Sequence, residues 1–214
     1  MTANTLFLDP LDVLFLRGNK LFGDPGSYGE SLVPPWPSVA AGALRSRMLA
    51  DAKTDLAAFA RGEIIHPELG TPAAPGPFAV TAFHLARRLA DGRVEILVAP
   101  PTDLVVNEGD DGKVSVCALT PQPVGAYKIA SSSPFPDLPV LSEAARGKPA
   151  PGYWLTEAGW RAYLAGKLPA SAQLVKSADL WANDPRVGVG LDITTGRASD
   201  GRLFSMQAVA MREG

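Results

Sequence analysis

The residue types that most often carry acid–base or metal chemistry are scarce in this sequence. It contains two histidines, His66 and His84, and one cysteine, Cys117. Neither histidine has a second histidine or an Asp/Glu motif at the spacing that a metal site or a catalytic pair needs. Cys117 lies in a strand-like pattern, where a buried and unreactive thiol is the ordinary case. The pattern favours structural or surface roles for all three, and we expect no metal or other cofactor.

Two short motifs were weighed as binding sites for a nucleotide or a cation. The Gly-Val-Gly at 188–190 lacks the third glycine and the following helix of a dinucleotide-binding turn. Asp110 and Asp111 are typical of a solvated hairpin tip rather than of a cation site. The sequence contains no P-loop, kinase, nucleophile-elbow or EF-hand pattern. Support for enzyme chemistry is therefore weak.

One stretch, "SLVPPWPSVAAGALRSRML" (31–49), begins with closely spaced prolines and ends with two arginines. Because proline fixes φ and disfavours helix just before it, a helix is predicted to begin at Ser38. Free backbone N–H groups and the helix dipole favour an anion such as phosphate there, and Ser38 could cap the helix or share that phosphate. Arg45 and Arg47 lie on different faces of this predicted helix. Each either contacts RNA or belongs to a solvated helix face. Trp36 is either a hydrophobic plug or a base-stacking side chain.

The overall charge restricts how this chain could bind nucleic acid. Its formal net charge is −2 at pH 7, and no basic tail or run is present. A free-standing nucleic-acid binder usually has a basic excess, so any contact is expected from a local patch or within a larger assembly. Arg17 and Lys20 bracket "RGNK" in the loop before the helix, where Gly18 would let the backbone approach a ligand closely.

The length and amino-acid composition of the chain indicate a soluble globular protein. With 214 residues, 46% hydrophobic and 20% charged, the chain can form one large domain or two small ones. A single cysteine excludes an internal disulfide, and with no secretion-like N-terminus it makes the reducing cytoplasm the expected location. Asp9, Pro10 and Asp12 interrupt the apolar N-terminus well short of the roughly 20 residues of a membrane span.

Hydrophobic periodicity and turn residues predict the elements that would position these side chains. Strands are expected at 6–8 and 13–16, in two hairpins with turns at Asp91-Gly92 and Asp111-Gly112, and at 187–193 and 203–211. Helices are expected from Ser38, over 54–62, and over 155–167 with Thr156 as N-cap. This order predicts an α+β fold with helices on one face of a largely antiparallel sheet, and ferredoxin-like packing is the simplest candidate.

Two local features qualify this prediction. Gly42 costs about 1 kcal/mol inside a helix, which suggests that its helix lies close to a strand or loop. The segment 120–151 is rich in proline and is predicted to be irregular, as a functional arm or a disordered loop. Tyr127 and Lys128 are its best candidates for touching RNA or a neighbouring subunit.

Four pieces of the sequence occur in an order that resembles a known family. They are "DPLDVLFLR", the proline-led "PSVAAGALR", the helix "GYWLTEAGWRAYLAGK" and the strand pair "RVGVGLDITTGRASDGRLF". Together they resemble the RAMP-superfamily CRISPR-associated proteins, specifically the third subunit of the type III-B (Cmr) effector complex. The resemblance extends over most of the chain.

This resemblance implies a ferredoxin-like (RRM-like) RAMP fold and no catalysis of its own. It implies a subunit that binds the repeat-derived five-prime handle of the guide RNA, docks the large polymerase/cyclase-fold subunit and contacts a neighbouring backbone RAMP subunit in antiviral defence. It also makes Arg186, in "NDPR", an RNA-binding candidate. The complete set of candidates is Arg17, Lys20, Ser38, Arg45, Arg47 and Arg186.

The resemblance also implies a domain division. We expect an N-terminal ferredoxin-like region with insertions over 1–120, a proline-rich loop or arm over 121–152, and the start of a second ferredoxin-like region over 153–214. Family members usually continue past a point like Gly214 into a glycine-rich loop. The second unit is therefore expected to be incomplete, in a shortened member or a fragment.

Two other functions remain open from the residues alone. One is a RAMP endoribonuclease that cuts repeat RNA, for which His66 or Tyr28 would be the general base. The other is a pure protein-docking subunit, in which the proline-rich loops bind partners and nucleic acid is never touched.

Overall fold

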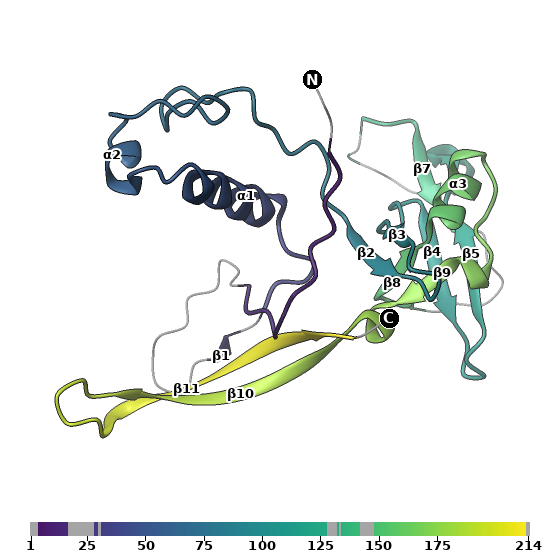
Figure 1. Cartoon of the computed structure of the whole chain (residues 1–214). Coiled ribbons are helices and arrows are strands. Elements are labelled where there is room, and N and C mark those ends of the chain that lie inside the picture. Colours follow the sequence, from purple (N-terminus) through teal and green to yellow (C-terminus); the bar gives the residue numbers. More distant parts are fainter. Residues whose placement is uncertain are drawn as a thin grey trace. The chain divides into compact units, whose positions relative to one another are not determined.

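The chain is divided into two compact units that are interleaved along the sequence. The computed structural model describes residues 4–16, 28–29, 31–127, 132, 134–141 and 148–212. Unit 1 comprises Met1–Val13, Leu85–Asp184 and Ala210–Gly214, and unit 2 comprises Leu14–His84 and Pro185–Val209. Helices are mixed with small, mostly antiparallel sheets, which confirms the α+β class (Figure 1). The predicted boundaries at 120 and 152 stay a prediction.

The described residues of unit 1 form four two-stranded antiparallel sheets. These pair β2 (Leu85–Arg88) with β3 (Val94–Leu97), β4 (Leu104–Glu108) with β5 (Val114–Ala118), β6 (Thr120–Pro123) with β7 (Asp137–Val140), and β8 (Tyr153–Leu155) with β9 (Leu174–Lys176). The two hairpins with Asp-Gly turns are confirmed, and Gly92 and Gly112 adopt φ values of 83° and 75°. Glycine accepts this left-handed backbone without steric cost, which is why the turns could be predicted.

The pairing of β6 with β7 was not expected from the sequence. The segment around it was predicted to be irregular because of its prolines, yet Pro121 stands opposite Pro139 in an antiparallel register. Proline is tolerated at the edge of a sheet, where its missing N–H faces away from the partner strand. Each strand of a two-stranded sheet is an edge strand, so the two prolines are compatible with the pairing. A 3-10 helix, Val124–Tyr127, follows β6.

The core of unit 1 lies under β3, β9 and α4 (Ser177–Leu180). Leu97, Val175 and Leu180 are buried together, and Leu85, Trp154 and Trp181 pack against them. The rings of Trp154 and Trp181 meet edge to face at 6.1 Å. The indole of Trp154 also donates a hydrogen bond of 2.9 Å to Ser177 Oγ, so its polar end is satisfied where its ring is buried.

Helix α3 (Glu157–Leu164) begins as the sequence predicts. The Thr156 hydroxyl accepts a hydrogen bond from the Gly159 N–H at 3.2 Å and lies 3.2 Å from the Gln173 carbonyl, to which it donates. A 3-10 helix (Ser171–Gln173) carries that carbonyl. The cap therefore ties the start of α3 to a segment well beyond its end.

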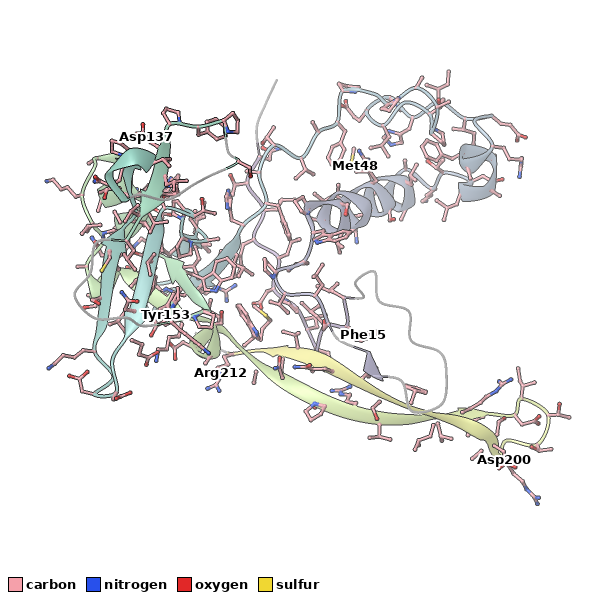
Figure 2. All side chains as sticks on the ribbon, turned by 180° about the vertical axis from the view of Figure 1, so that it is seen from behind. Phe15, Met48, Asp137, Tyr153, Asp200 and Arg212 are labelled. Atoms are coloured by element: carbon pink, nitrogen blue, oxygen red, sulfur yellow. The ribbon has the colours of Figure 1, made fainter. Side chains whose placement is uncertain are left out.

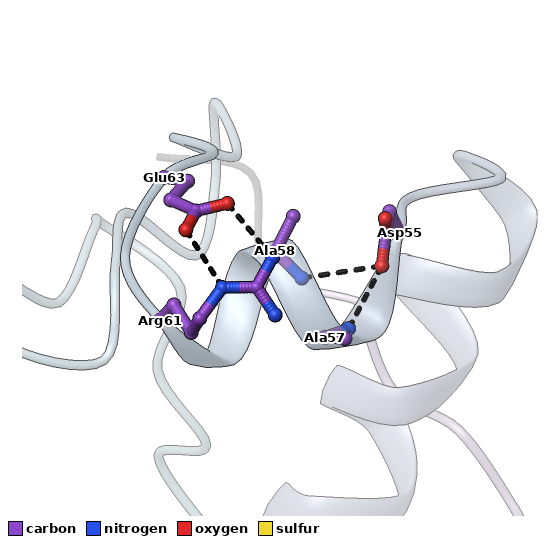
Figure 3. A network of polar contacts seen from close by, with 5 residues as sticks. All are labelled: Asp55, Ala57, Ala58, Arg61 and Glu63. Atoms are coloured by element: carbon purple, nitrogen blue, oxygen red, sulfur yellow. Dashed lines mark hydrogen bonds and ion pairs between the residues drawn. The ribbon is translucent and has the colours of Figure 1, made fainter.

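Unit 2 contains the helices α1 (Pro37–Asp51) and α2 (Leu56–Ala60). Asp55 caps α2 by accepting hydrogen bonds from Ala57 N at 2.9 Å and Ala58 N at 3.1 Å (Figure 3). Arg61 then pairs with Glu63 at 2.6 Å after the helix ends. The expected helix over 54–62 is therefore present but shorter, because its cap is Asp55 and not Thr54.

The sheet of unit 2 is built on a long hairpin. It joins β10 (Trp181–Leu191) to β11 (Ala198–Met211), and β1 (Tyr28–Gly29) pairs with β11 in parallel (Figure 1). The hairpin is longer than the predicted strands at 187–193 and 203–211, and both strands extend into unit 1. Asp192 closes its turn by accepting from the backbone N–H groups of Thr194 and Thr195.

The predicted N-terminal strand at 6–8 is wrong. Residues 4–10 have no regular structure, and the leucines Leu6, Leu8 and Leu11 are exposed. In the expected strand at 13–16, Leu14 forms an isolated antiparallel bridge by exchanging two backbone hydrogen bonds of 2.8 Å with Val209, and the Leu16 carbonyl accepts a hydrogen bond of 2.7 Å from Leu32 N. Asp9 and Pro10 explain part of the difference, since neither residue favours a strand. Within the described residues, no helix is long and apolar enough to cross a membrane.

Candidate nucleic-acid and subunit interface

The cap of α1 lies two residues before Ser38, the predicted cap. Trp36 occupies the N-cap position, Pro37 is the first helical residue and Ser38 the second, so Ser38 is not the cap. The reason is that the fixed φ of proline already suits the first helical position. No side chain caps this end, and no acidic residue lies in the first turn. Backbone N–H groups are consequently left without a side-chain acceptor at this end.

Arg45 and Arg47 differ in what surrounds them. Arg45 follows Ser38 by seven residues, which is close to two helical turns, so both lie on one face of α1. The Arg45 guanidinium lies 5.8 Å from the centre of the Phe78 ring, within the range of a cation–π contact. Arg47 points to another face and forms two contacts of 2.9 Å with Asp51. Arg45 is therefore the arginine that shares a surface with Ser38.

The two faces of the β10–β11 hairpin are unlike each other. The Phe204 ring lies over Gly188, and the aliphatic part of Arg202 lies over Gly190. Because successive side chains of a strand alternate between faces, the opposite face carries Val187, Val189, Leu191 and Leu203. All four are exposed, with 43% to 70% of their surface accessible. Side chains stand out along the whole ribbon in Figure 2. We call these four residues the apolar hairpin face.

A family model described as "CRISPR-associated protein (Cas_Cmr3)" matches residues 6–214. The chain belongs to the Cmr3 family of type III-B CRISPR-associated proteins. This confirms the resemblance drawn from the sequence motifs, and it identifies the chain as a Cmr-complex CRISPR subunit. A search of curated proteins finds no match.

In this Cmr3-family chain, the predicted RNA-binding residues are distributed over separate elements. Ser38, Arg45 and Arg47 are all exposed on α1, and Arg186 is exposed on β10. Arg17, Lys20 and Lys128 lie outside the described residues, and the side chain of Tyr127 does so as well. Among the described candidates, only Ser38 and Arg45 share one helix face.

The histidines of this Cmr3-family chain occupy different surroundings. His66 Nδ1 accepts hydrogen bonds from the backbone N–H groups of Glu68 at 3.1 Å and Leu69 at 3.2 Å. That nitrogen holds a tight loop in shape, which is the structural role favoured by the sequence. His84 is exposed directly before β2 and not inside a strand. Among the described residues, no group of three His, Cys, Asp or Glu side chains is placed to hold a metal ion.

A polar cluster in unit 1 was missed by sequence reasoning. Glu108 accepts a hydrogen bond of 2.9 Å from Tyr153 and an ion-pair contact of 2.5 Å from Lys176. Lys176 and Tyr153 hold the pKa of Glu108 below its usual range, and Glu108 raises the pKa of Lys176. Burial, and then the hydrogen bond to Glu108, raises the pKa of Tyr153. These shifts favour a charged lysine, an ionised carboxylate and a protonated tyrosine, and their contacts join β4, β8 and β9.

Proposed function

We propose that this Cmr3-family subunit binds the repeat-derived five-prime handle of the guide RNA and docks the large polymerase/cyclase-fold subunit and a backbone RAMP subunit. The observation that carries the proposal is the family match over residues 6–214. We propose in addition that it contributes no catalysis of its own, and that ferredoxin-like packing relates it to other RAMP proteins.

The candidate contacts on α1 support the RNA-binding part of this proposal. Arg45 is exposed on the same face as Ser38, and the nearby helix end lacks a side-chain cap. Phosphate groups are bound by arginine side chains and by free backbone N–H groups. A subunit with net charge −2 can hold RNA in this way when only a few contacts are its own and partner subunits supply the rest.

The first experiment is purification of the tagged protein from its native cell, followed by sequencing of the RNA that accompanies it. We expect short RNAs that share one repeat-derived five-prime end. The substitutions Arg17→Glu, Arg45→Glu and Arg186→Glu should each reduce the guide RNA retained. Arg93→Glu is the matched control, since Arg93 is an exposed arginine of unit 1 paired with Asp91. Full retention of guide RNA by all three test variants would refute the RNA-binding proposal.

The proposed absence of catalysis has its own test. Repeat RNA is incubated with the wild-type protein and with the His66→Ala and Tyr28→Phe variants. We expect no cleavage by any of them. Cleavage by the wild type that is lost in either variant would replace the proposal with a RAMP endoribonuclease. Partner binding without bound RNA, unchanged by nuclease treatment, would instead indicate a pure docking subunit.

A further inference from the structure

Residues 66–78 of unit 2 form a closed loop that is held by its own backbone. His66 and Gly70 exchange two backbone hydrogen bonds of 2.9 and 2.8 Å, and the Gly76 N–H donates to the Leu69 carbonyl at 2.9 Å. Leu69 is buried. Gly70 has a φ of 71°, and a side chain at Gly70 would collide with the opposite side of the loop. Glycine meets both conditions without strain, so the sequence allows the loop to close tightly.

The side chain of His66 completes this closure. Its Nδ1 accepts the backbone N–H groups of Glu68 and Leu69, which lie two and three residues further along the chain. Since Nδ1 is an acceptor, the proton of the neutral ring is on Nε2. The Oδ1 of an asparagine stands at the same place in its side chain and commonly accepts from the same two positions. The loop therefore requires an acceptor atom at position 66, and not an imidazole as such.

The loop ends at Phe78, and Phe78 supports Arg45 of α1. The Phe78 N–H donates a hydrogen bond of 3.0 Å to the Glu68 carbonyl, which ties it to the part of the loop that His66 holds. The Arg45 guanidinium lies 5.8 Å from the centre of the half-buried Phe78 ring. None of the ion pairs among the described residues involves Arg45. The ring therefore contacts this guanidinium without using its N–H donors.

We propose that the loop 66–78 positions Arg45 for RNA: Phe78 holds the guanidinium where it binds a phosphate, and His66 holds the loop that carries Phe78. The inference deepens the proposed function and rests on the RNA contact proposed for Arg45. An arginine side chain loses rotamer freedom when it binds a ligand, and a ring that already restricts it lowers that cost. Phe78 and His66 are then positioning residues, which act on RNA through Arg45.

The first test measures the guide RNA that co-purifies from the native cell and stays bound during washes at increasing salt concentration. Phe78→Leu should lower the RNA retained at an intermediate salt concentration by roughly two- to fivefold, as expected for an exposed cation–π contact. Phe78→Tyr keeps an aromatic ring and should retain the wild-type amount. Phe59→Leu makes the same change on α2 and should have no effect. In an Arg45→Gln background, Phe78→Leu should cause no further loss, because it acts only through Arg45.

The second test separates the loop closure by His66 from any chemistry of its ring. His66→Ala should lower the retained RNA as Phe78→Leu does. His66→Asn should restore it, since Oδ1 replaces Nδ1 as the acceptor of the two N–H groups. A general base at position 66 would be lost in both variants. Equal RNA retention by the alanine and asparagine variants would overturn the role given to His66.

The third test examines the contact itself in the full chain without RNA. The NMR resonance of the Arg45 Nε–H is assigned by its loss in Arg45→Gln. It should move in Phe78→Leu and in His66→Ala, but not in Phe59→Leu, because the ring of Phe78 shields it. An unmoved resonance in Phe78→Leu would overturn the inference. Circular dichroism confirms that each variant is folded.

The RNA measurements also distinguish this inference from the function on which it rests. If Arg45→Gln lowers the retained RNA but Phe78→Leu does not, the inference is wrong while RNA binding by Arg45 stands. If Arg45→Gln retains the full amount, the RNA contact proposed for Arg45 is itself wrong, and the inference falls with it. Additive losses in the double variant would show that Phe78 acts by another route, which would also overturn it.

Discussion

The helices α3 of unit 1 and α1 of unit 2 differ in how their first turns are capped and in how closely other segments pack against them. Thr156 caps α3 with its hydroxyl, whereas α1 starts from Trp36 without a side-chain cap. Each helix contains a glycine, and the two glycines have opposite surroundings. An added Cβ at Gly159 would lie 2.8 Å from the Gln173 carbonyl oxygen, whereas at Gly42 the described residues place no atom within 4 Å of an added Cβ, apart from the chain neighbours and the backbone of α1 itself. Contacts within its unit therefore fix α3 in place, while α1 keeps much of its surface free.

A strand of unit 1 and a strand of unit 2 differ in their exposure in the same sense. Leu155, directly before α3, is completely buried, whereas Val187, Val189 and Leu191 on β10 are exposed. Apolar surface that a chain leaves exposed often marks a binding surface. We therefore expect the α3 region to contribute mainly to the stability of this Cmr subunit, and α1 and the hairpin to contribute mainly to recognition. The predictions below test that division.

The largest effect is expected from Leu155→Ala. Removing a fully buried leucine leaves a cavity beneath α3 and should cost about 2 to 5 kcal/mol of unfolding free energy. Val39→Ala, at an exposed position of α1, should change the unfolding free energy by less than about 0.5 kcal/mol. Urea unfolding followed by circular dichroism measures both. Equal losses for the two variants would break the comparison between α3 and α1.

Gly159→Ala should destabilise the protein although alanine favours helices. Its Cβ would collide with a backbone carbonyl that cannot easily move, and overpacking of this kind costs about 1 to 3 kcal/mol. The same urea titration reports the change. An unchanged or higher midpoint would mean that α3 can move away from the Ser171–Gln173 segment, and that the region is less fixed than described.

Gly42→Ala is the matched change in α1 and should have the opposite sign. With open space around Gly42, the substitution gains about 1 kcal/mol of helix propensity at no steric cost. The sequence alone suggested that Gly42 allows a close approach to a strand or loop, and none of the described strands or loops makes such an approach. A loss of guide-RNA retention in this stabilised variant would indicate that the proposed RNA surface includes Gly42 itself.

Features set by local sequence could be predicted, whereas those set by distant contacts could not. The Asp-Gly turns and the Thr156 cap depend on residues a few positions apart, so their patterns were sufficient. The pairing of Pro121 with Pro139, and the open space at Gly42, depend on which segments meet in the fold. The cap of α1 was predicted at Ser38 because serine is a good cap, but it lies two residues earlier, at Trp36, because Pro37 is a better first helical residue.

The candidate site follows the same rule. The exposure of Ser38, Arg45 and Arg47 on α1 agrees with a helix that follows a proline-rich approach. The ring of Phe78 beneath Arg45 and the two backbone N–H groups bound by His66 were not foreseen, because both need a loop to close. The Glu108 cluster escaped notice for the same reason, since its three members come from three strands.

The smallest expected effect is on how the stability of the protein depends on pH through the cluster of Glu108, Tyr153 and Lys176. The pKa of Glu108 is lower in the folded protein than its ordinary value, because Lys176 and then Tyr153 stabilise the carboxylate. The stabilisation is therefore present above the unfolded pKa of about 4.3 and is lost as the pH falls through the lower folded value. Glu108→Gln should flatten this part of the dependence of the urea midpoint on pH between about pH 6 and 3. Lys176→Met should reduce it as well, since it removes the main cause of the shift. If both variants kept the wild-type slope, the cluster would not couple β4 to β8 and β9 in solution, and the tighter construction of unit 1 would rest on its apolar core and the Thr156 cap alone.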